Sequence, residues 1–139
     1  MKKVVYVFIL TFVLNFIWEV SQAFLYTSHY VGISKLIKVH FIASLGDILI
    51  ISIIFLLSYM VSSFNFLKDK LNIKNFLLVI VIGFVVAVFV EKYFLMTGKW
   101  QYNFMMPVIP FLNVGLIPIL QLMLIPAIVI SFWSWIKNK

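Results

Sequence analysis

The sequence predicts an all-α protein, an integral membrane bundle of four transmembrane helices that forms a single domain over residues 1–139. Two observations carry this prediction. Hydrophobic residues make up 65% of the chain and charged residues only 11%. Apolar runs of about 20 residues also recur, which is the length that crosses a hydrocarbon core of about 30 Å. The absence of Cys excludes disulfides and thiolate metal sites.

Four spans are expected, at residues 4–26, 41–61, 76–96 and 114–136. The connection at residues 27–40 has a mixed apolar and polar pattern that favours a short interfacial helix between the first two spans. The connection at residues 62–75 is rich in lysine, whereas residues 97–113 contain aromatic residues and two prolines. Nothing in the chain indicates a soluble domain.

The lysines predict the orientation of the bundle. Seven lie at the termini or in the connection 62–75 (Lys2, Lys3, Lys68, Lys70, Lys74, Lys137 and Lys139), against four on the other side (Lys35, Lys38, Lys92 and Lys99). Cytoplasmic segments carry the excess of positive charge, so both termini are expected in the cytoplasm. The net charge of +7 is interpreted as contact with anionic lipid rather than with nucleic acid.

The basic residues and the apolar composition also suggest a source. All eleven basic residues are lysine, and Ile and Phe are frequent. This usage favours an AT-rich bacterial genome and therefore the cytoplasmic membrane of a bacterium.

Three of the four acidic residues lie inside the expected spans: Glu19, Asp47 and Glu91. A charged side chain at the centre of a bilayer costs about 2.5–3.5 kcal/mol on insertion scales unless it faces protein or water. Because successive spans alternate in direction, all three acids fall at one membrane level, on the outer side. For Glu91 the adjacent Lys92 and the nearby helix end offer a purely structural explanation.

Helical spacing adds a second constraint. Two sets of polar residues repeat every three or four positions, so each set shares a helix face: Asn15, Glu19, Gln22 and Tyr26 in the first span, and His40, Ser44 and Asp47 in the second. In the third span Gly83, Ala87 and Glu91 are four residues apart, and small residues there would let a neighbouring helix approach closely.

The fourth span and the connection before it complete the expected pocket. Pro118 lies three residues before Gln121, and a proline within the helix would leave the carbonyl of Val114 free to line a cavity. Trp100 and Tyr102 are expected to cap the pocket, although such residues also serve as interfacial anchors.

These patterns give two lists of candidate residues. The catalytic candidates are Glu19, Asp47, Glu91 and His40, and the substrate-binding candidates are Asn15, Gln22, Tyr26, Ser44, Trp100, Tyr102 and Gln121. No metal site and no cofactor are predicted, because no H-x-x-x-H or H-E-x-x-H spacing occurs. A divalent cation held by His40 and the acids is a weakly supported alternative. The serines lack a G-x-S-x-G context and are expected to bond to their own helix backbone.

Several short motifs resemble those of a group of small four-helix bacterial membrane proteins without an assigned activity. The motifs are Trp18-Glu19-x-x-Gln22, Gly46-Asp47, Gly98-Lys99-Trp100-x-Tyr102, Met106-Pro107-x-x-Pro110 and Pro118-x-x-Gln121. The architecture is also similar to that of EXPERA-type four-helix proteins, which include sterol isomerases. That resemblance implies an acidic intramembrane pocket entered from the bilayer, with Glu19, Asp47, Glu91 and Trp100 as counterparts.

Three functions fit this sequence. The first is an intramembrane enzyme that performs acid–base chemistry on a lipid or another hydrophobic small molecule, in a pocket where titratable groups converge. The second is a protein that binds or transports a cation or an amphipathic ligand and acts as a homo-oligomer. The third is an accessory subunit whose polar residues pair with a partner membrane protein.

Overall fold

The structure is a computed structural model that describes residues 2–27 and 31–138, so Lys139 and part of the connection at 27–40 lie outside the described residues. Its elements are α1 (Lys2–Gln22), the 3-10 helix η1 (Ala23–Leu25), α2 (Ile33–Ser62), α3 (Ile73–Met96), β1 (Val108–Ile109), β2 (Val114–Gly115) and α4 (Leu116–Lys137). Within the described residues, four helices are long and apolar enough to cross a membrane. The predicted all-helical class is therefore confirmed.

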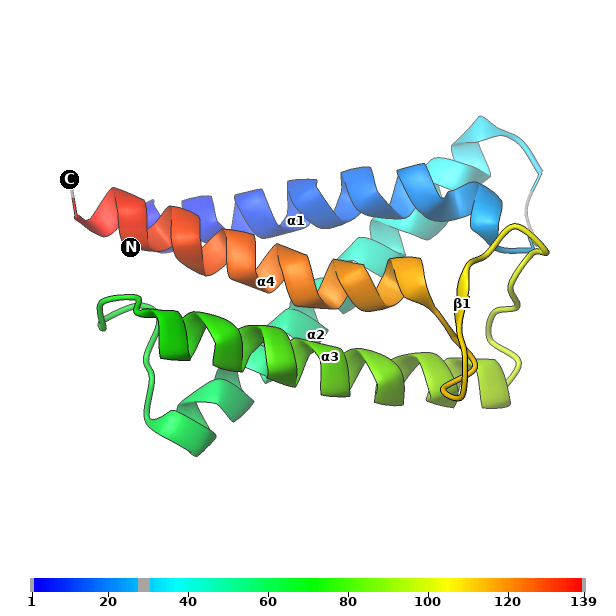
Figure 1. Ribbon diagram of the computed structural model, residues 1–139. Helices are drawn as coiled ribbons and strands as arrows, with labels where there is room; N and C mark the ends of the chain where they lie inside the picture. The colour runs from blue at the N-terminus through cyan, green and yellow to red at the C-terminus, as the bar shows by residue number, and fades with distance from the viewer. Residues whose placement is uncertain (1, 28–30, 139) are drawn as a thin grey trace.

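The four helices form a bundle with two distinct ends (Figure 1). Both termini and the loop between α2 and α3 lie at one end, which we call the termini end. The β1–β2 hairpin and the segment that follows η1 lie at the other end, which we call the hairpin end. Connections that alternate between two ends are the arrangement expected for four successive membrane spans.

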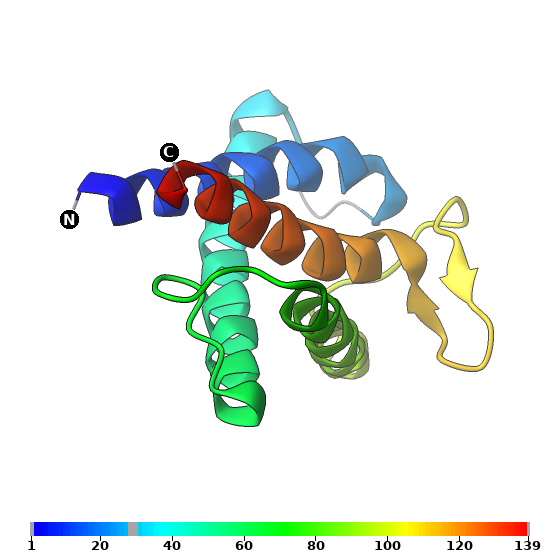
Figure 2. The same cartoon turned by 60° about the vertical axis from the view of Figure 1, so that its left-hand side comes forward.

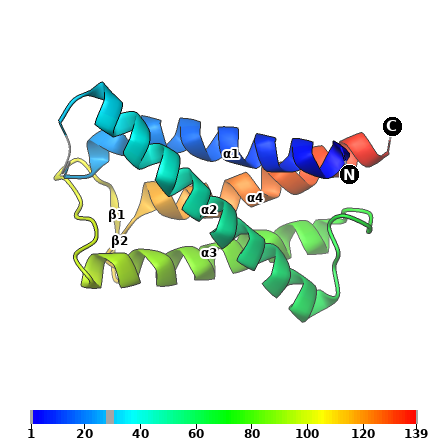
Figure 3. The same cartoon turned by 180° about the vertical axis from the view of Figure 1, so that it is seen from behind.

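Helix α2 differs from its expected form. A separate interfacial helix and a start at residue 41 were predicted, but α2 begins directly after Gly32, whose φ is 91°, and runs without a break for 30 residues. No Gly or Pro lies between residues 33 and 45 to interrupt it. At 1.5 Å per residue it is about 45 Å long, so it must tilt to fit a hydrocarbon core of about 30 Å. Figure 3 shows α2 crossing the other helices obliquely.

Local signals explain where the other helices begin and end. The side chain of Asn72 accepts a hydrogen bond from the Asn75 N–H at 2.9 Å, which caps the start of α3. After α3, Gly98 takes a left-handed conformation with φ of 67°, a common way to end a helix. These boundaries lie within a few residues of the predicted ones.

The position of Pro118 corrects one expectation. Because α4 begins at Leu116, Pro118 lies in its first turn, where the N–H has no acceptor within the helix. Val114 belongs to strand β2 instead of α4. The proposed free carbonyl inside the helix is therefore wrong, and Pro118 marks the start of α4.

A small hairpin at residues 108–115 was not predicted. Val108 pairs with Gly115 and Ile109 with Val114 in antiparallel register. The four-residue loop between the strands contains Phe111, whose side chain is 99% exposed and whose φ is 69°. Two-residue strands are too short to produce a readable alternation of apolar and polar residues.

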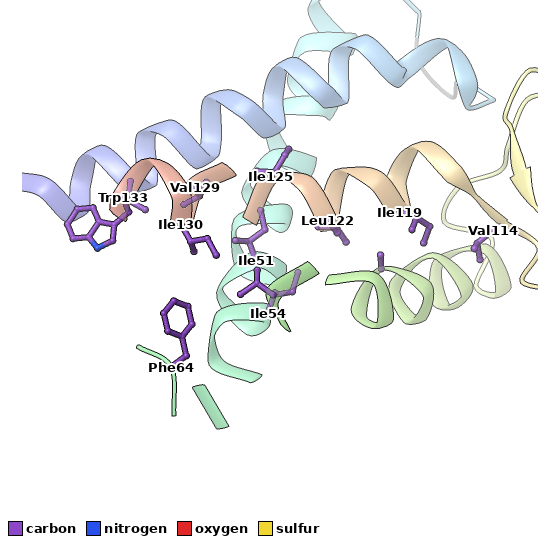
Figure 4. Close-up of a cluster of buried hydrophobic side chains, with 13 residues drawn as sticks. Ile51, Ile54, Phe64, Val114, Ile119, Leu122, Ile125, Val129, Ile130 and Trp133 are labelled. Atoms are coloured by element: carbon purple, nitrogen blue, oxygen red, sulfur yellow. The ribbon is translucent and has the colours of Figure 1, made fainter. Parts of the chain in front are cut away.

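Helix α4 is the centre of the bundle. In the most apolar stretch of α4, 56% of the residues are buried, whereas the corresponding share in the other three helices is 17–22%. Figure 2 shows α4 between α1 and α3, with α2 crossing behind. Figure 4 shows its apolar side chains Ile125, Val129 and Ile130 beside Ile51 and Ile54 of α2, in one buried cluster. The other helices expose many large apolar side chains, such as Ile9, Leu49 and Phe89.

Helix α3 packs very closely against α4 at Gly83. A Cβ atom added to Gly83 would lie 2.3 Å from the backbone oxygen of Leu122. Ala87 and Glu91, which follow on the same face, are also buried. The expectation that small residues on this face allow a close helix approach is confirmed.

Candidate functional site

A partly open cavity of about 350 Å³ lies toward the hairpin end, between all four helices. We call this cavity the pocket. Eight of the predicted site residues line it: Glu19, Gln22, Tyr26, His40, Asp47, Glu91, Trp100 and Gln121. Its remaining wall is mostly apolar and includes Ile50, Val90 and Phe94. The volume is at the lower end of the range of ligand sites, about 300–1,000 Å³.

Two glutamine amides connect three helices across one side of the pocket. Gln22 donates from Nε2 to Glu19 Oε1 at 2.7 Å and to Gln121 Oε1 at 3.0 Å. Gln121 donates from Nε2 to Asn15 Oδ1 at 3.0 Å and to Asp47 Oδ2 at 2.8 Å. An amide nitrogen carries two protons, so both amides use all of theirs. Glu19 of α1 and Asp47 of α2 are thereby joined through one continuous chain of hydrogen bonds.

This amide chain lies deep inside the protein. Asn15 is 0% exposed, and Gln22 and Gln121 are each 3% exposed. Turning either glutamine amide around would place its oxygen against acceptor oxygens, so the partners fix its orientation. Buried polar groups that satisfy one another in this way specify a single packing of the helices.

Replacing Gln121 with Leu is expected to destabilise the protein by about 2 kcal/mol. The substitution keeps a side chain of similar size but leaves polar groups of Asn15, Gln22 and Asp47 without their partner. Each hydrogen bond between membrane helices contributes about 0.6 kcal/mol on average, and buried groups left unpaired add to the loss. The measurement is unfolding of the purified protein in mixed micelles with increasing SDS.

Gln101→Leu provides the matched control, because the side chain of Gln101 is exposed. It should change the unfolding free energy by less than about 0.5 kcal/mol, as surface substitutions usually do. Equal stability losses for the two variants would show that the amide chain does not hold the helices together.

Glu19 also contacts His40. The Nδ1 atom of His40 lies 3.2 Å from Glu19 Oε2, and the two side chains are only 9% and 14% exposed. Ser44, which is fully buried, donates to the backbone oxygen of His40 at 2.7 Å. A carboxylate beside an imidazole is an arrangement that can accept and pass on a proton.

Glu91 forms a second pair, with Tyr102. The Tyr102 hydroxyl donates to Glu91 Oε2, and it accepts a hydrogen bond from the Gly115 N–H at 2.8 Å. Burial raises the pKa of Tyr102 above its ordinary value, and the Glu91 carboxylate adds to the effect. The phenol therefore stays protonated as a donor. Glu91 is 4% exposed, whereas the neighbouring Lys92 is exposed at the surface. Lys92 therefore does not neutralise the Glu91 carboxylate.

Aromatic rings surround the acidic part of the pocket. Trp100 stacks on Phe94 with ring centroids 4.2 Å apart, and it meets Tyr26 edge-on at 6.2 Å. Burial raises the pKa of Tyr26, and Glu91 raises it further, so this phenol also stays neutral. Trp100 and Glu91 both line the pocket, and the buried Nε1 of Trp100 makes no hydrogen bond with a described residue.

The predicted site residues divide into two groups. Asn15, Ser44 and Tyr102 do not line the pocket but support residues that do. Conversely, sequence reasoning missed Thr27 and Phe94 as lining residues. The sequence could have indicated Phe94, because Phe94 lies three residues after Glu91 and therefore shares a helix face with it. Lys99, quoted only within a motif, also lines the pocket.

Backbone contacts fix the aromatic part of the site. The Thr27 N–H donates to the backbone oxygen of Gln101 at 2.9 Å, and the Asn103 N–H donates to that of Leu25 at 2.8 Å. These bonds join the segment after η1 to the segment after α3. Residues far apart in the sequence, such as Tyr26 and Tyr102, are therefore neighbours, with ring centroids 5.6 Å apart.

The serine hydroxyls and the possible metal ligands were also predicted from the sequence. Ser21, Ser44 and Ser52 each donate to a backbone oxygen three or four residues earlier in the same helix, which confirms the expected backbone bonding. No group of three His, Asp or Glu side chains within the described part of the chain is arranged to hold a metal ion.

Comparisons with protein-family models, with curated proteins and with solved structures gave no match for this chain.

Proposed function

We propose that the protein transfers protons to and from a hydrophobic, lipid-like molecule bound in the pocket. One observation carries the proposal: three carboxylates and several aromatic rings, contributed by three helices and two connecting segments, line one mostly apolar cavity. Titratable groups gathered in a cleft that is largely removed from water are typical of acid–base sites.

The contact between Glu19 and His40 suggests separate roles for two of the acids. In the proposed reaction Asp47, in its protonated form, gives its proton to one carbon of a C=C bond, whose π electrons form the new C–H bond. Glu19 then takes a proton from the carbon on the far side of the cationic carbon, and the electrons of that C–H bond form a C=C bond at the new position. The net change is a shift of the double bond, and no co-reactant is consumed. His40, in contact with Glu19, passes the proton to solvent, and Asp47 takes up a proton from solvent, which restores the starting state.

The rest of the pocket supports a positively charged intermediate. The carbon that does not receive the proton becomes cationic until Glu19 acts. Aromatic faces attract cations by about 0.5–2 kcal/mol each, more when water is excluded, and Tyr26, Phe94 and Trp100 line the pocket. The Glu91 carboxyl group, held in place by Tyr102, adds negative charge when it is ionised. Such preorganised electrostatics is commonly the largest contribution to catalysis.

The surroundings support a ligand taken from the membrane. Four of the described helices are long and apolar enough to span a bilayer, which supports lipid as the medium at the level of the pocket. The lysine distribution supports cytoplasmic termini, which would place the pocket toward the outer side of a bacterial cytoplasmic membrane.

Solvent-deuterium incorporation tests this proposal. The purified protein is placed in vesicles made from total lipid of the producing cells, the vesicles are transferred to D₂O, and the extracted lipids are examined by mass spectrometry. Protons on the carboxylates exchange with solvent, so a lipid that has turned over gains carbon-bound deuterium. Wild-type protein should enrich at least one lipid, and the Glu19→Gln/Asp47→Asn double variant should not. Equal labelling by both proteins would refute the proposed acid–base role.

A second candidate is binding of an amphipathic cation, and the same combination of aromatic rings and carboxylates favours it. Under this alternative the acids provide counter-charge and no bond is made or broken. Tetraphenylphosphonium should then raise the melting temperature of wild-type protein but not that of Glu19→Gln, and no lipid should gain deuterium.

A further inference from the structure

Gly46 of α2 lies beside Asp47 and lines the pocket. A Cβ atom added to Gly46 would meet no atom of another element within 4 Å. The space in front of this glycine is therefore open, in the part of the pocket where Asp47 provides a carboxylate.

Neither the backbone conformation nor the packing requires a glycine at position 46. Among the described glycines only Gly32 and Gly98 have a positive φ, so Gly46 has an ordinary helical backbone. At Gly83, by contrast, an added Cβ would collide with the backbone of Leu122 at 2.3 Å. Glycine inside a helix is less favourable than alanine. The missing side chain at position 46 thus reduces helix stability and relieves no clash.

The residues around Gly46 show what the open space can hold. Ala43, one turn before it, and Ile50, one turn after it, also line the pocket. Val90 and Phe94 of α3 complete this wall. Two of the three α2 residues in this wall are small, and the side chains of the wall are apolar. The wall suits a hydrocarbon chain rather than a polar group.

We propose that Gly46 is the residue that determines ligand size, and that the hydrocarbon chain of a lipid lies against its bare backbone. This inference rests on the proposed function, because it names the part of the lipid that the reacting groups would meet. A side chain at position 46 would fill the space beside Asp47 and exclude the hydrocarbon chain.

Photolabelling tests this inference without requiring turnover. The full-length protein is reconstituted in vesicles of phosphatidylcholine that carries a diazirine in one acyl chain, and the labelled positions are mapped by mass spectrometry after illumination. Wild-type protein should carry label on pocket residues, including Asp47 and Glu91. Label on these residues should fall in Gly46→Ala and disappear in Gly46→Leu.

The controls distinguish exclusion of the acyl chain from the pocket from misfolding of the variant protein. Gly46→Ala should melt at or above the wild-type temperature, because alanine favours a helix and meets no obstacle. Leu49→Phe changes an α2 side chain that is 68% exposed and does not line the pocket, so its pocket labelling should equal that of wild type. Unchanged pocket labelling in a folded Gly46→Leu protein, or no pocket labelling in wild type, would overturn the inference.

The two proposals can fail independently. Pocket labelling that depends on position 46, without deuterium incorporation, would retain the lipid site and reject proton transfer. Deuterium incorporation that persists in Gly46→Leu would retain proton transfer and reject the role of Gly46.

Discussion

Replacing Glu19 with Gln is expected to lower the rate of deuterium incorporation into lipid by about 10²–10⁴-fold, the usual contribution of a general acid or base. The change keeps the size of the side chain, and its Oε1 can still accept from Gln22 Nε2. It removes only the carboxylate that takes up the proton beside His40. The rate is measured as label gained per unit time in vesicles under D₂O.

Asp69→Asn is the matched control for this loss. Asp69 is an exposed acid in the loop between α2 and α3, at the termini end. Its replacement should leave the incorporation rate unchanged. If Glu19→Gln retains the wild-type rate while the protein stays folded, Glu19 is not the proton acceptor.

Replacing Gly83 with Ala is expected to destabilise the protein by about 3 kcal/mol, the upper end of the usual cost of overpacking. The added methyl group would lie 2.3 Å from the backbone oxygen of Leu122 and 3.2 Å from its carbonyl carbon. Backbone atoms cannot rotate away as a side chain can, so α3 and α4 must separate. SDS-induced unfolding of the purified protein measures the loss.

Gly46→Ala makes the same chemical change in another helix, and its effect should have the opposite sign. No atom obstructs the methyl group there, and alanine is favoured over glycine inside a helix by about 0.5–1 kcal/mol. Similar stabilities of the two alanine variants would show that α3 and α4 do not approach as closely at Gly83 as the structure indicates.

Much of the site could be predicted from the sequence because its signals are local. The cost of placing Glu19, Asp47 and Glu91 in apolar spans marks them as unusual. Alternating spans put them at one level, and spacings of three and four put Gln22 and His40 on the same faces as the acids. These arguments need only the helix period and the length of a span, and the structure brings all five residues to one pocket.

The remaining features depend on contacts between distant segments. Nothing in the spacing of Asn15 and Gln121 indicates that they bond to each other across 106 residues. The pairing of Tyr102 with Glu91 likewise follows from a hairpin and a loop whose short segments carry no periodic pattern. The continuous α2 was missed because mixed polarity was interpreted as a boundary, although residues 33–45 contain no Gly or Pro that could interrupt the helix.

The central position of α4 has a consequence for how the protein is made. The ribosome synthesises α4 last, yet α4 carries Gln121, which supplies or accepts hydrogen bonds for Asn15 and Gln22 of α1 and Asp47 of α2. Elongation proceeds at about 5–20 residues per second, so α1–α3 exist for seconds before these groups acquire that partner. The acidic pocket is therefore completed only after α4 has been made, and a chain truncated before Leu116 would leave Asn15, Gln22 and Asp47 without the hydrogen bonds of Gln121.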